Sequence, residues 1–168
     1  MVVQITALLA TEDLMSARSA IPKALAEGMA AAINGSAPYV ENLYGNVINK
    51  VTHFEDIQNF PTVGITPGPE SRVDQPSNFT LCYVDIYIRI YVKNNNDAQA
   101  ELERIISDIE TYVDDNQRLQ YSVDTPLGGS DTDFTISNSI ASIATDEGLL
   151  EPLALGEIVL QVEYRKLR

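Results

Sequence analysis

Apolar and polar residues alternate without a break through Leu81–Val92. One face consists of Cys82, Val84, Ile86, Ile88, Ile90 and Val92, and the other of Tyr83, Asp85, Tyr87, Arg89 and Tyr91. A shift of one residue would place the whole apolar face in water, so the pattern predicts a half-buried strand of fixed register. At about 3.4 Å per residue such a strand reaches roughly 40 Å, about twice the usual length, and we expect it to extend beyond the core.

A second strand of this kind is predicted at Glu157–Arg165. Its apolar positions are Ile158, Leu160, Val162 and Tyr164. Two shorter strands are predicted at Val47–Phe54 and Thr62–Thr66, because β-branched residues there lie between glycines and prolines.

A polar strand is predicted at Phe134–Ala144, after a pair of glycines. We expect Phe134, Ile136 and Ile140 to face inward. Ile143 is out of phase with them, which indicates a β-bulge.

Helical spacing predicts a first helix between Leu14 and Ile33. Its apolar positions are Leu14, Ala17, Ile21, Ala24, Leu25, Met29 and Ile33. Asn34 and Gly35 supply the left-handed cap that ends such a helix. Pro22 has no amide hydrogen, so it either kinks this helix or stands in its first turn. We favour the second arrangement, in which the main helix begins at Pro22.

A second helix is predicted from the Asn94–Asp97 segment to about Asp115. The segment offers several N-caps, and Gln99 is placed to close a capping box on Asn96. The apolar stripe is Leu102, Ile105, Ile106, Ile109 and Val113. The other face carries Glu101, Glu103, Asp108 and Glu110. We expect that face to be solvated, with Arg104 in a weak pair with Glu101.

The stretch Pro67–Asn78 contains three prolines, a glycine and several charges but no apolar period. This composition predicts an exposed, mobile loop, which is a candidate docking element. Its candidate interface residues are Pro67, Glu70, Arg72 and Asp74.

Tyrosines form a ladder on the polar face of the Leu81–Val92 strand. Tyrosine buries area while it keeps a polar tip, and it is enriched at interfaces between proteins. The candidate interface residues on this face are Tyr83, Tyr87, Arg89 and Tyr91. A hydrated sheet face, or one covered by the chain's own loops, fits the same pattern equally well.

The composition is that of one soluble domain with a substantial core: 168 residues, 45% hydrophobic and 21% charged. The 24 acidic and 11 basic residues give a net charge of -13, so the surface repels phosphate, which argues against reading nucleic acid. Residues 1–13 are apolar at first but lack the basic start of a signal peptide, and we interpret them as an N-terminal extension. No uncharged run approaches the roughly 18 to 20 residues of a membrane span.

Candidate chemistry is scarce in this sequence. His53 is the only histidine, which excludes a multi-histidine metal site. Cys82 is the only cysteine, and its place on an apolar strand face predicts burial; its lack of an intramolecular disulfide partner suits folding in a reducing cytoplasm. The segment from Gly128 to Asp133 lacks the ligand spacing of a calcium loop. We therefore expect no catalytic, metal-binding or cofactor-binding residues, and no enzyme.

The order of the predicted elements is a helix, a strand, the Phe60–Ile65 stretch, a proline-rich loop, a long amphipathic strand, a helix and two closing strands. Three motifs follow near the end of the chain: Ile143–Gly148, Pro152–Ile158 and Val162–Arg165. In this order and spacing, the chain resembles the tail terminator, or tail completion, proteins of tailed bacteriophages over nearly its whole length. The resemblance implies an α+β fold, with a mixed or mostly antiparallel sheet and two helices packed on it.

The resemblance also implies a structural virion protein that is assembled in the host cytoplasm. It would form a ring, usually six-fold, at the head-proximal end of the tail tube, where it stops tube growth and offers a docking surface for the capsid neck. The implied partners are further copies of the chain, the tube protein, the sheath if the tail is contractile, and neck proteins. DNA would pass through the ring without specific binding, and no membrane is involved.

Two alternatives stay open at the level of sequence. A head-to-tail connector or stopper subunit would share the size, the acidity and the ring habit. A small cytoplasmic ligand-binding protein or enzyme would need a concave pocket with converging polar groups, and the sequence reveals none.

Overall fold

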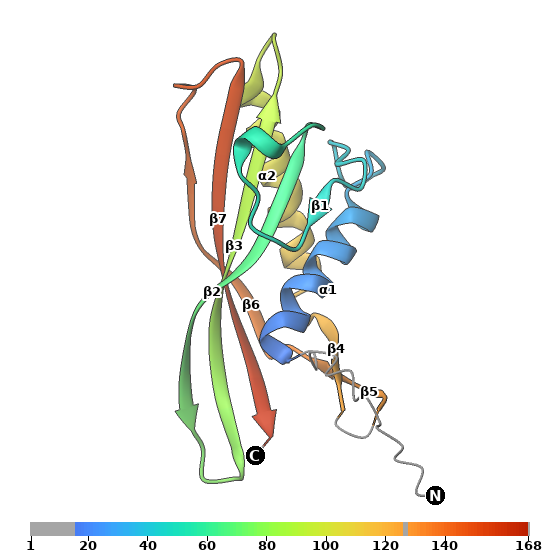
Figure 1. Cartoon of the computed structure of the whole chain (residues 1–168), viewed down its shortest axis with the longest axis vertical. Coiled ribbons are helices and arrows are strands. Elements are labelled where there is room, and N and C mark those ends of the chain that lie inside the picture. Colours follow the sequence, from blue (N-terminus) through green and yellow to red (C-terminus); the bar gives the residue numbers. More distant parts are fainter. Residues whose placement is uncertain (1–15, 126–127, 168) are drawn as a thin grey trace, which may run out of the picture.

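The computed structural model describes residues 16–125 and 128–167. Within them, five strands form a mixed, mostly antiparallel sheet of order β1-β2-β3-β7-β6, and two α-helices lie against one of its faces (Figure 1). A separate hairpin, β4-β5, stands beside α1. The elements are α1 (Ala17–Ala32), β1 (Val47–Ile48), the 3-10 helix η1 (Phe54–Asp56), β2 (Thr62–Asp74), β3 (Phe79–Lys93), α2 (Ala98–Asp115), β4 (Gln120–Asp124), β5 (Ser130–Phe134), β6 (Ser137–Thr145) and β7 (Leu153–Leu167). The predicted α+β class is confirmed.

The centre of the sheet is the long antiparallel pair β3 and β7. The two strands pair along their whole lengths, from Phe79 opposite Leu167 to Lys93 opposite Leu153. The apolar side chains that alternation assigned to the inner faces of both strands are buried. Both amphipathic strands, and the faces that they bury, are therefore confirmed.

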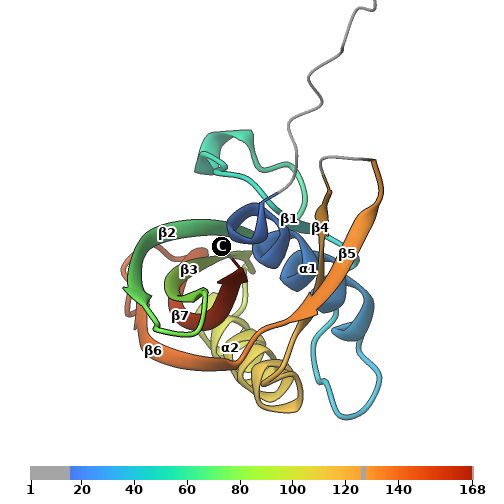
Figure 2. The ribbon, with the colours of Figure 1, turned by 90° about the horizontal axis from the view of Figure 1, so that it is seen from below.

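Both helices cover the same side of the sheet, as the view from below shows (Figure 2). α2 lies close to β7 because Gly156 has no side chain: a β-carbon there would come 2.9 Å from Cδ1 of Leu102. The ends of β2, β3 and β7 extend past the helices at the foot of Figure 1. The expectation that the long strand reaches beyond the helix-covered core is thus confirmed.

Pro22 lies inside α1, which begins at Ala17, so the prediction that the main helix begins at Pro22 is wrong. Proline cannot donate the helical hydrogen bond to the carbonyl of Arg18, which is a cost to the helix. The turn before it is nevertheless formed, because Ala20 and Ile21 are buried in the core. Their burial offsets the missing bond.

β2 continues to Asp74, so most of the predicted Pro67–Asn78 loop is a strand. The ladder with β3 is interrupted by a bulge between Pro67 and Glu70. Proline is tolerated at bulges and on strand edges, and beside this part of β2 the short β1 makes no pairs. Only residues 75–78 connect β2 to β3.

The predicted strand Val47–Phe54 is mostly irregular, since β1 covers only its first two residues. The chain then turns into η1, where the ring of Phe54 lies 6.0 Å from the rings of both Phe60 and Tyr91. This aromatic packing depends on Tyr91, which is distant in the sequence, so local β-propensity did not predict it.

The predicted strand Phe134–Ala144 is divided between two sheets. Thr135 is buried between β5 and β6 and separates them. Phe134 is exposed at the end of the hairpin, so its predicted inward orientation is wrong. The predicted bulge is confirmed and lies between Ile140 and Ser142.

α2 ends where the sequence predicted, at Asp115, and its N-cap, Asp97, lies in the predicted N-cap segment. The side chain of Asp97 accepts the hydrogen bond of the Ala100 amide at 2.9 Å. Gln99 donates to Glu103 along the helix and does not close a box on Asn96. The predicted capping box is wrong because the helix begins one residue later than that box requires.

Candidate functional site

The face of the sheet opposite the helices carries the tyrosine ladder, and we call it the helix-free face. Tyr83, Tyr87 and Tyr91 lie on it, and each is partly exposed. By strand register the neighbouring positions on this face are Ser137, Ser139 and Ser142 of β6 and Glu157, Gln161 and Glu163 of β7. Val159, opposite Tyr87, and Leu155, opposite Tyr91, lie on the same face. The face is therefore mixed, with aromatic rings set among small, charged and aliphatic side chains.

Arg89 connects two parts of this face. Its Nε donates to Oε2 of Glu157 on β7 at 2.8 Å, and its guanidinium lies 5.4 Å from the centre of the Tyr87 ring. The ion pair is partly exposed, so it contributes at most about 1 kcal/mol to stability. The Tyr87 ring lies between this guanidinium and Gly68 of β2, where a β-carbon would come 2.5 Å from Cε2 of the ring, and these two contacts hold the ring in place.

Tyr91 is covered by the chain itself. Its hydroxyl donates to the carbonyl of Thr52 at 3.2 Å, and its ring lies against Phe54 of η1. For this tyrosine, the alternative of a face covered by the chain's own loops holds. Tyr83 and Tyr87 remain candidates for contact with a partner.

The other four candidate interface residues do not join the ladder. Glu70, Arg72 and Asp74 on β2 pair with buried residues of β3, which places them toward the helix side of the sheet. Pro67 is exposed at the bulge. The eight candidates thus form two separate groups on different faces.

Glu70 is an internal anchor and not an exposed docking residue, because its side chain is only 4% exposed. It accepts hydrogen bonds from the Tyr164 hydroxyl at 2.7 Å and from Nε of Arg72 at 2.6 Å. Burial alone raises the pKa of Glu70, but these hydrogen bonds and the charges of Arg72 and Arg18 bring it below its ordinary value. Burial and the hydrogen bond to the carboxylate raise the pKa of Tyr164.

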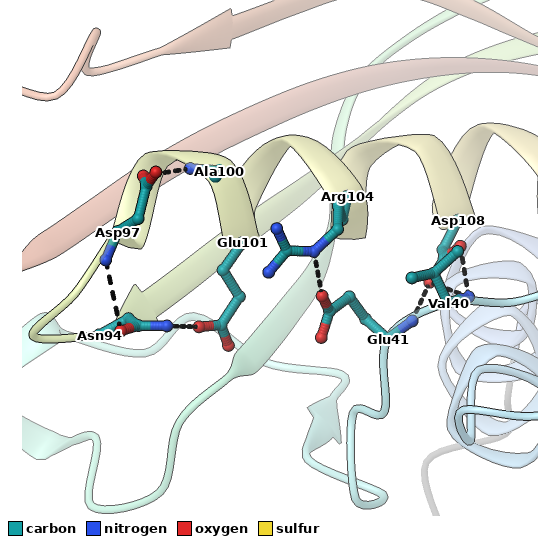
Figure 3. Close-up of polar contacts among 8 residues, drawn as sticks. All are labelled: Val40, Glu41, Asn94, Asp97, Ala100, Glu101, Arg104 and Asp108. Carbon is teal, nitrogen blue, oxygen red and sulfur yellow. Dashed lines mark hydrogen bonds and ion pairs between the residues drawn. The ribbon is translucent and has the colours of Figure 1, made fainter.

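A buried carboxylate on α2 holds the loop between α1 and β1 (Figure 3). Asp108 is 3% exposed and accepts the amide of Val40 at 3.0 Å and that of Glu41 at 2.7 Å. Such charge-assisted bonds are stronger than those between neutral groups. The expectation that Asp108 is solvated is wrong, because it lies one turn after Ile105, at the edge of the apolar stripe, and the loop folds over it.

Arg104 binds the same loop, and its predicted pairing with Glu101 is wrong. Nε of Arg104 donates to Oε1 of Glu41, while Oε2 of Glu101 accepts from Nδ2 of Asn94 at 2.6 Å (Figure 3). Spacing along a helix could not reveal Glu41 as the partner, since it comes from a distant part of the sequence.

The described residues contain no group of three or more side chains that could hold a metal ion. His53 is exposed, and Cys82 is buried as its position predicted. None of the helices in residues 16–125 and 128–167 is long and apolar enough to cross a membrane. What stands out instead is a sheet face with partly exposed tyrosines and a rigidly held loop, and such features suit contacts between proteins.

Residues 15–168 match the protein family described as Bacteriophage Tail Tube Terminator Protein. The chain belongs to this family. The tail tube terminator protein of Escherichia phage T5 is 35% identical over 153 residues, which cover 90% of this chain and 95% of that protein.

A solved structure described as the virion of a native gene transfer agent particle contains a chain of similar fold. The TM-score is 0.54, over 88% of this chain and 96% of that chain. The two sequences are 11% identical, so this likeness concerns the fold alone.

As a tail tube terminator, the chain is a structural component of the phage tail. The resemblance drawn from the order of elements and the closing motifs is confirmed. The family that the chain matches is a structural one.

Proposed function

We propose that this terminator forms a closed ring of six subunits on the head-proximal end of the tail tube, where it ends tube growth and offers a docking surface for the capsid neck. The match of residues 15–168 to tail tube terminators carries this proposal. Neighbouring subunits join through two unlike surfaces, and the rotation between them closes a circle. Tube proteins, in contrast, stack into an open polymer.

The helix-free face supplies a contact with a neighbouring protein of the tail. Tyr83 and Tyr87 are partly exposed there, and Arg89 holds the ring of Tyr87 in place. A side chain that is already fixed loses little freedom when a partner binds, which favours it as an anchor.

DNA passes through the ring without specific binding. The chain carries 24 acidic against 11 basic residues, so it presents few cations to phosphate. Tight retardation of DNA by the purified protein at low salt would contradict this part of the proposal.

The test is to add the purified protein to growing tail tubes of the phage that encodes it and to examine them by negative-stain electron microscopy. We expect rings, and tubes that are blunted at one end and shorter than tubes grown with an unrelated acidic protein. A protein that stays monomeric and leaves tube length unchanged contradicts the proposal. A connector would instead bind the portal-side adaptor and leave tube ends free.

A further inference from the structure

Two loops on opposite flanks of the molecule expose bulky apolar side chains to solvent. The α1–β1 loop, residues 33–46, exposes Val40 and Tyr44, the latter to 72%. The β6–β7 turn, residues 146–152, exposes Leu149 and Leu150, the former to 85%. The loop follows α1 on one flank and the turn joins β6 to β7 on the other, toward the same end of the sheet (Figure 1).

The α1–β1 loop is held rigidly. Besides the bonds from its amides to Asp108, Oδ1 of Asn42 accepts the amide of Tyr44 at 2.7 Å. Tyr44 itself has a φ of 51°, which bulky residues rarely adopt. Local strain of this kind persists where the surrounding structure enforces it, and it gathers at functional positions. The tyrosine ring is therefore carried on a backbone of one fixed conformation.

The β6–β7 turn is organised in the same way by Asp146. Oδ2 of this carboxylate accepts the amide of Leu150 at 3.1 Å, and Oδ1 accepts that of Leu155 at 2.9 Å. Glu147 also has a positive φ, of 55°. The carboxylate thus fixes the backbone that presents Leu149, as Asp108 fixes the backbone that presents Tyr44.

We propose that, within the ring, Val40 and Tyr44 of one subunit pack against Leu149 and Leu150 of the next. This inference rests on the ring proposed above and names the surfaces that join its subunits. A ring contact needs two complementary patches on opposite flanks of one subunit, and these loops lie on opposite flanks. Aromatic and aliphatic side chains that are already held rigidly also lose the least conformational entropy when subunits associate.

Charge disfavours a contact between two β6–β7 turns. On the α1–β1 loop, the charge of Glu41 is balanced by its ion pair with Arg104. The β6–β7 turn carries the exposed carboxylates of Glu147 and Glu151 instead. Two turns facing each other would bring four carboxylates together, which disfavours a symmetric contact through the turn.

The first experiment uses Tyr44→Asp and Leu149→Asp, each purified alone and then mixed in equal amounts. Native mass spectrometry counts subunits in solution, and negative-stain microscopy counts rings on tail tubes. For ring formation in solution, Val73→Asp is the matched control, because Val73 is an exposed apolar residue near the opposite end of the sheet, on β2. Circular dichroism and the urea midpoint confirm that each variant is folded.

We expect neither Asp variant to form rings by itself, while Val73→Asp assembles like the wild type. The mixture should yield dimers and no rings, because each mixed pair has one intact junction and one with both patches damaged. The inference is overturned if either folded Asp variant still forms rings, or if one variant alone forms the dimer, since that result indicates a symmetric contact.

A cross-link captures the junction even where it is weak. In a Cys82→Ser background, the double variant Tyr44→Cys with Leu149→Cys should give a disulfide-linked ladder that ends at the ring size. The pair Tyr44→Cys with Val73→Cys should give none, and the reverse result overturns the inference. A wild-type protein that forms no ring alone or on tubes refutes the proposed function; wild-type rings that both Asp variants also form refute only the assignment of these loops.

Discussion

The hydroxyl of Tyr112 on α2 lies 1.9 Å from the point where a β-carbon would stand on Gly28 of α1. At this position glycine is needed for its missing side chain, because the two helices approach each other closely. Burial, and to a lesser degree the neighbouring Tyr39, raises the pKa of Tyr112 to about 12, so the hydroxyl stays protonated at neutral pH.

Gly28→Ala should lower the free energy of unfolding by about 1–3 kcal/mol because of overpacking. This loss is expected even though alanine has the better helix propensity by about 1 kcal/mol. Urea unfolding followed by circular dichroism measures it. The double variant with Tyr112→Phe should recover part of the loss, since the nearest clashing atom is gone; strictly additive losses would show that the contact is not the cause.

Asp108→Ala should destabilise the protein by about 1–3 kcal/mol, because the amides of Val40 and Glu41 lose their buried acceptor. Hydrogen exchange at those two amides should accelerate. The matched control is Glu110→Ala on the exposed face of the same helix, which should change stability by about 0.5 kcal/mol or less. Equal effects of the two substitutions would refute the role assigned to Asp108.

The acid sensitivity of the fold should depend partly on Glu70. Its pKa is lowered from 4.5 in the folded protein, so the unfolded chain takes up the proton first as the pH falls. The stability that Glu70 contributes is therefore complete above that ordinary value and is lost as the pH falls through the folded pKa. The Glu70→Gln variant has no carboxyl to titrate at this position, so it does not lose this contribution at low pH. The difference in unfolding free energy between the wild type and the variant should therefore shrink as the pH falls from about 6 to about 3. Parallel stability curves over that range would contradict the prediction.

Replacing both Tyr83 and Tyr87 by serine should weaken the capping of tail tubes about tenfold or more, as the loss of anchor residues does at other interfaces. The measurement is the protein concentration that halts half of the growing tubes. Ser139→Ala on the same face is the control and should leave this concentration unchanged. Unaltered capping by the folded double variant would show that the helix-free face makes no contact with the tail.

Elements whose signal lies in their own residues were predicted well. The alternation of β3 and β7 and the stripe of α2 describe how each element divides between core and water, and one sequence suffices to see that division. β2 was mistaken for a loop beyond Thr66 because its prolines interrupt the local signal, while its pairing with β3 supplies the order. Tertiary contact overrode propensity there.

The site residues were missed for a related reason. Asp108 and Glu70 were both read as solvated, since carboxylates are seldom buried without partners. Their partners are loop amides at Val40 and Glu41 and the hydroxyl of Tyr164, all distant in the sequence. Only the folded chain brings an acceptor and its donors together, so spacing alone carried no signal for either contact.

The pairing of β3 with β7 also governs how the chain reaches its native state. Even the nearest partners, Lys93 and Leu153, are separated by α2, β4, β5 and β6. A large loop must therefore close before the contacts of the central ladder can stabilise the fold. This requirement slows folding and makes it cooperative. Neither half of the chain could hold the ladder without the other, so newly made subunits should become competent for assembly only after this late, long-range step.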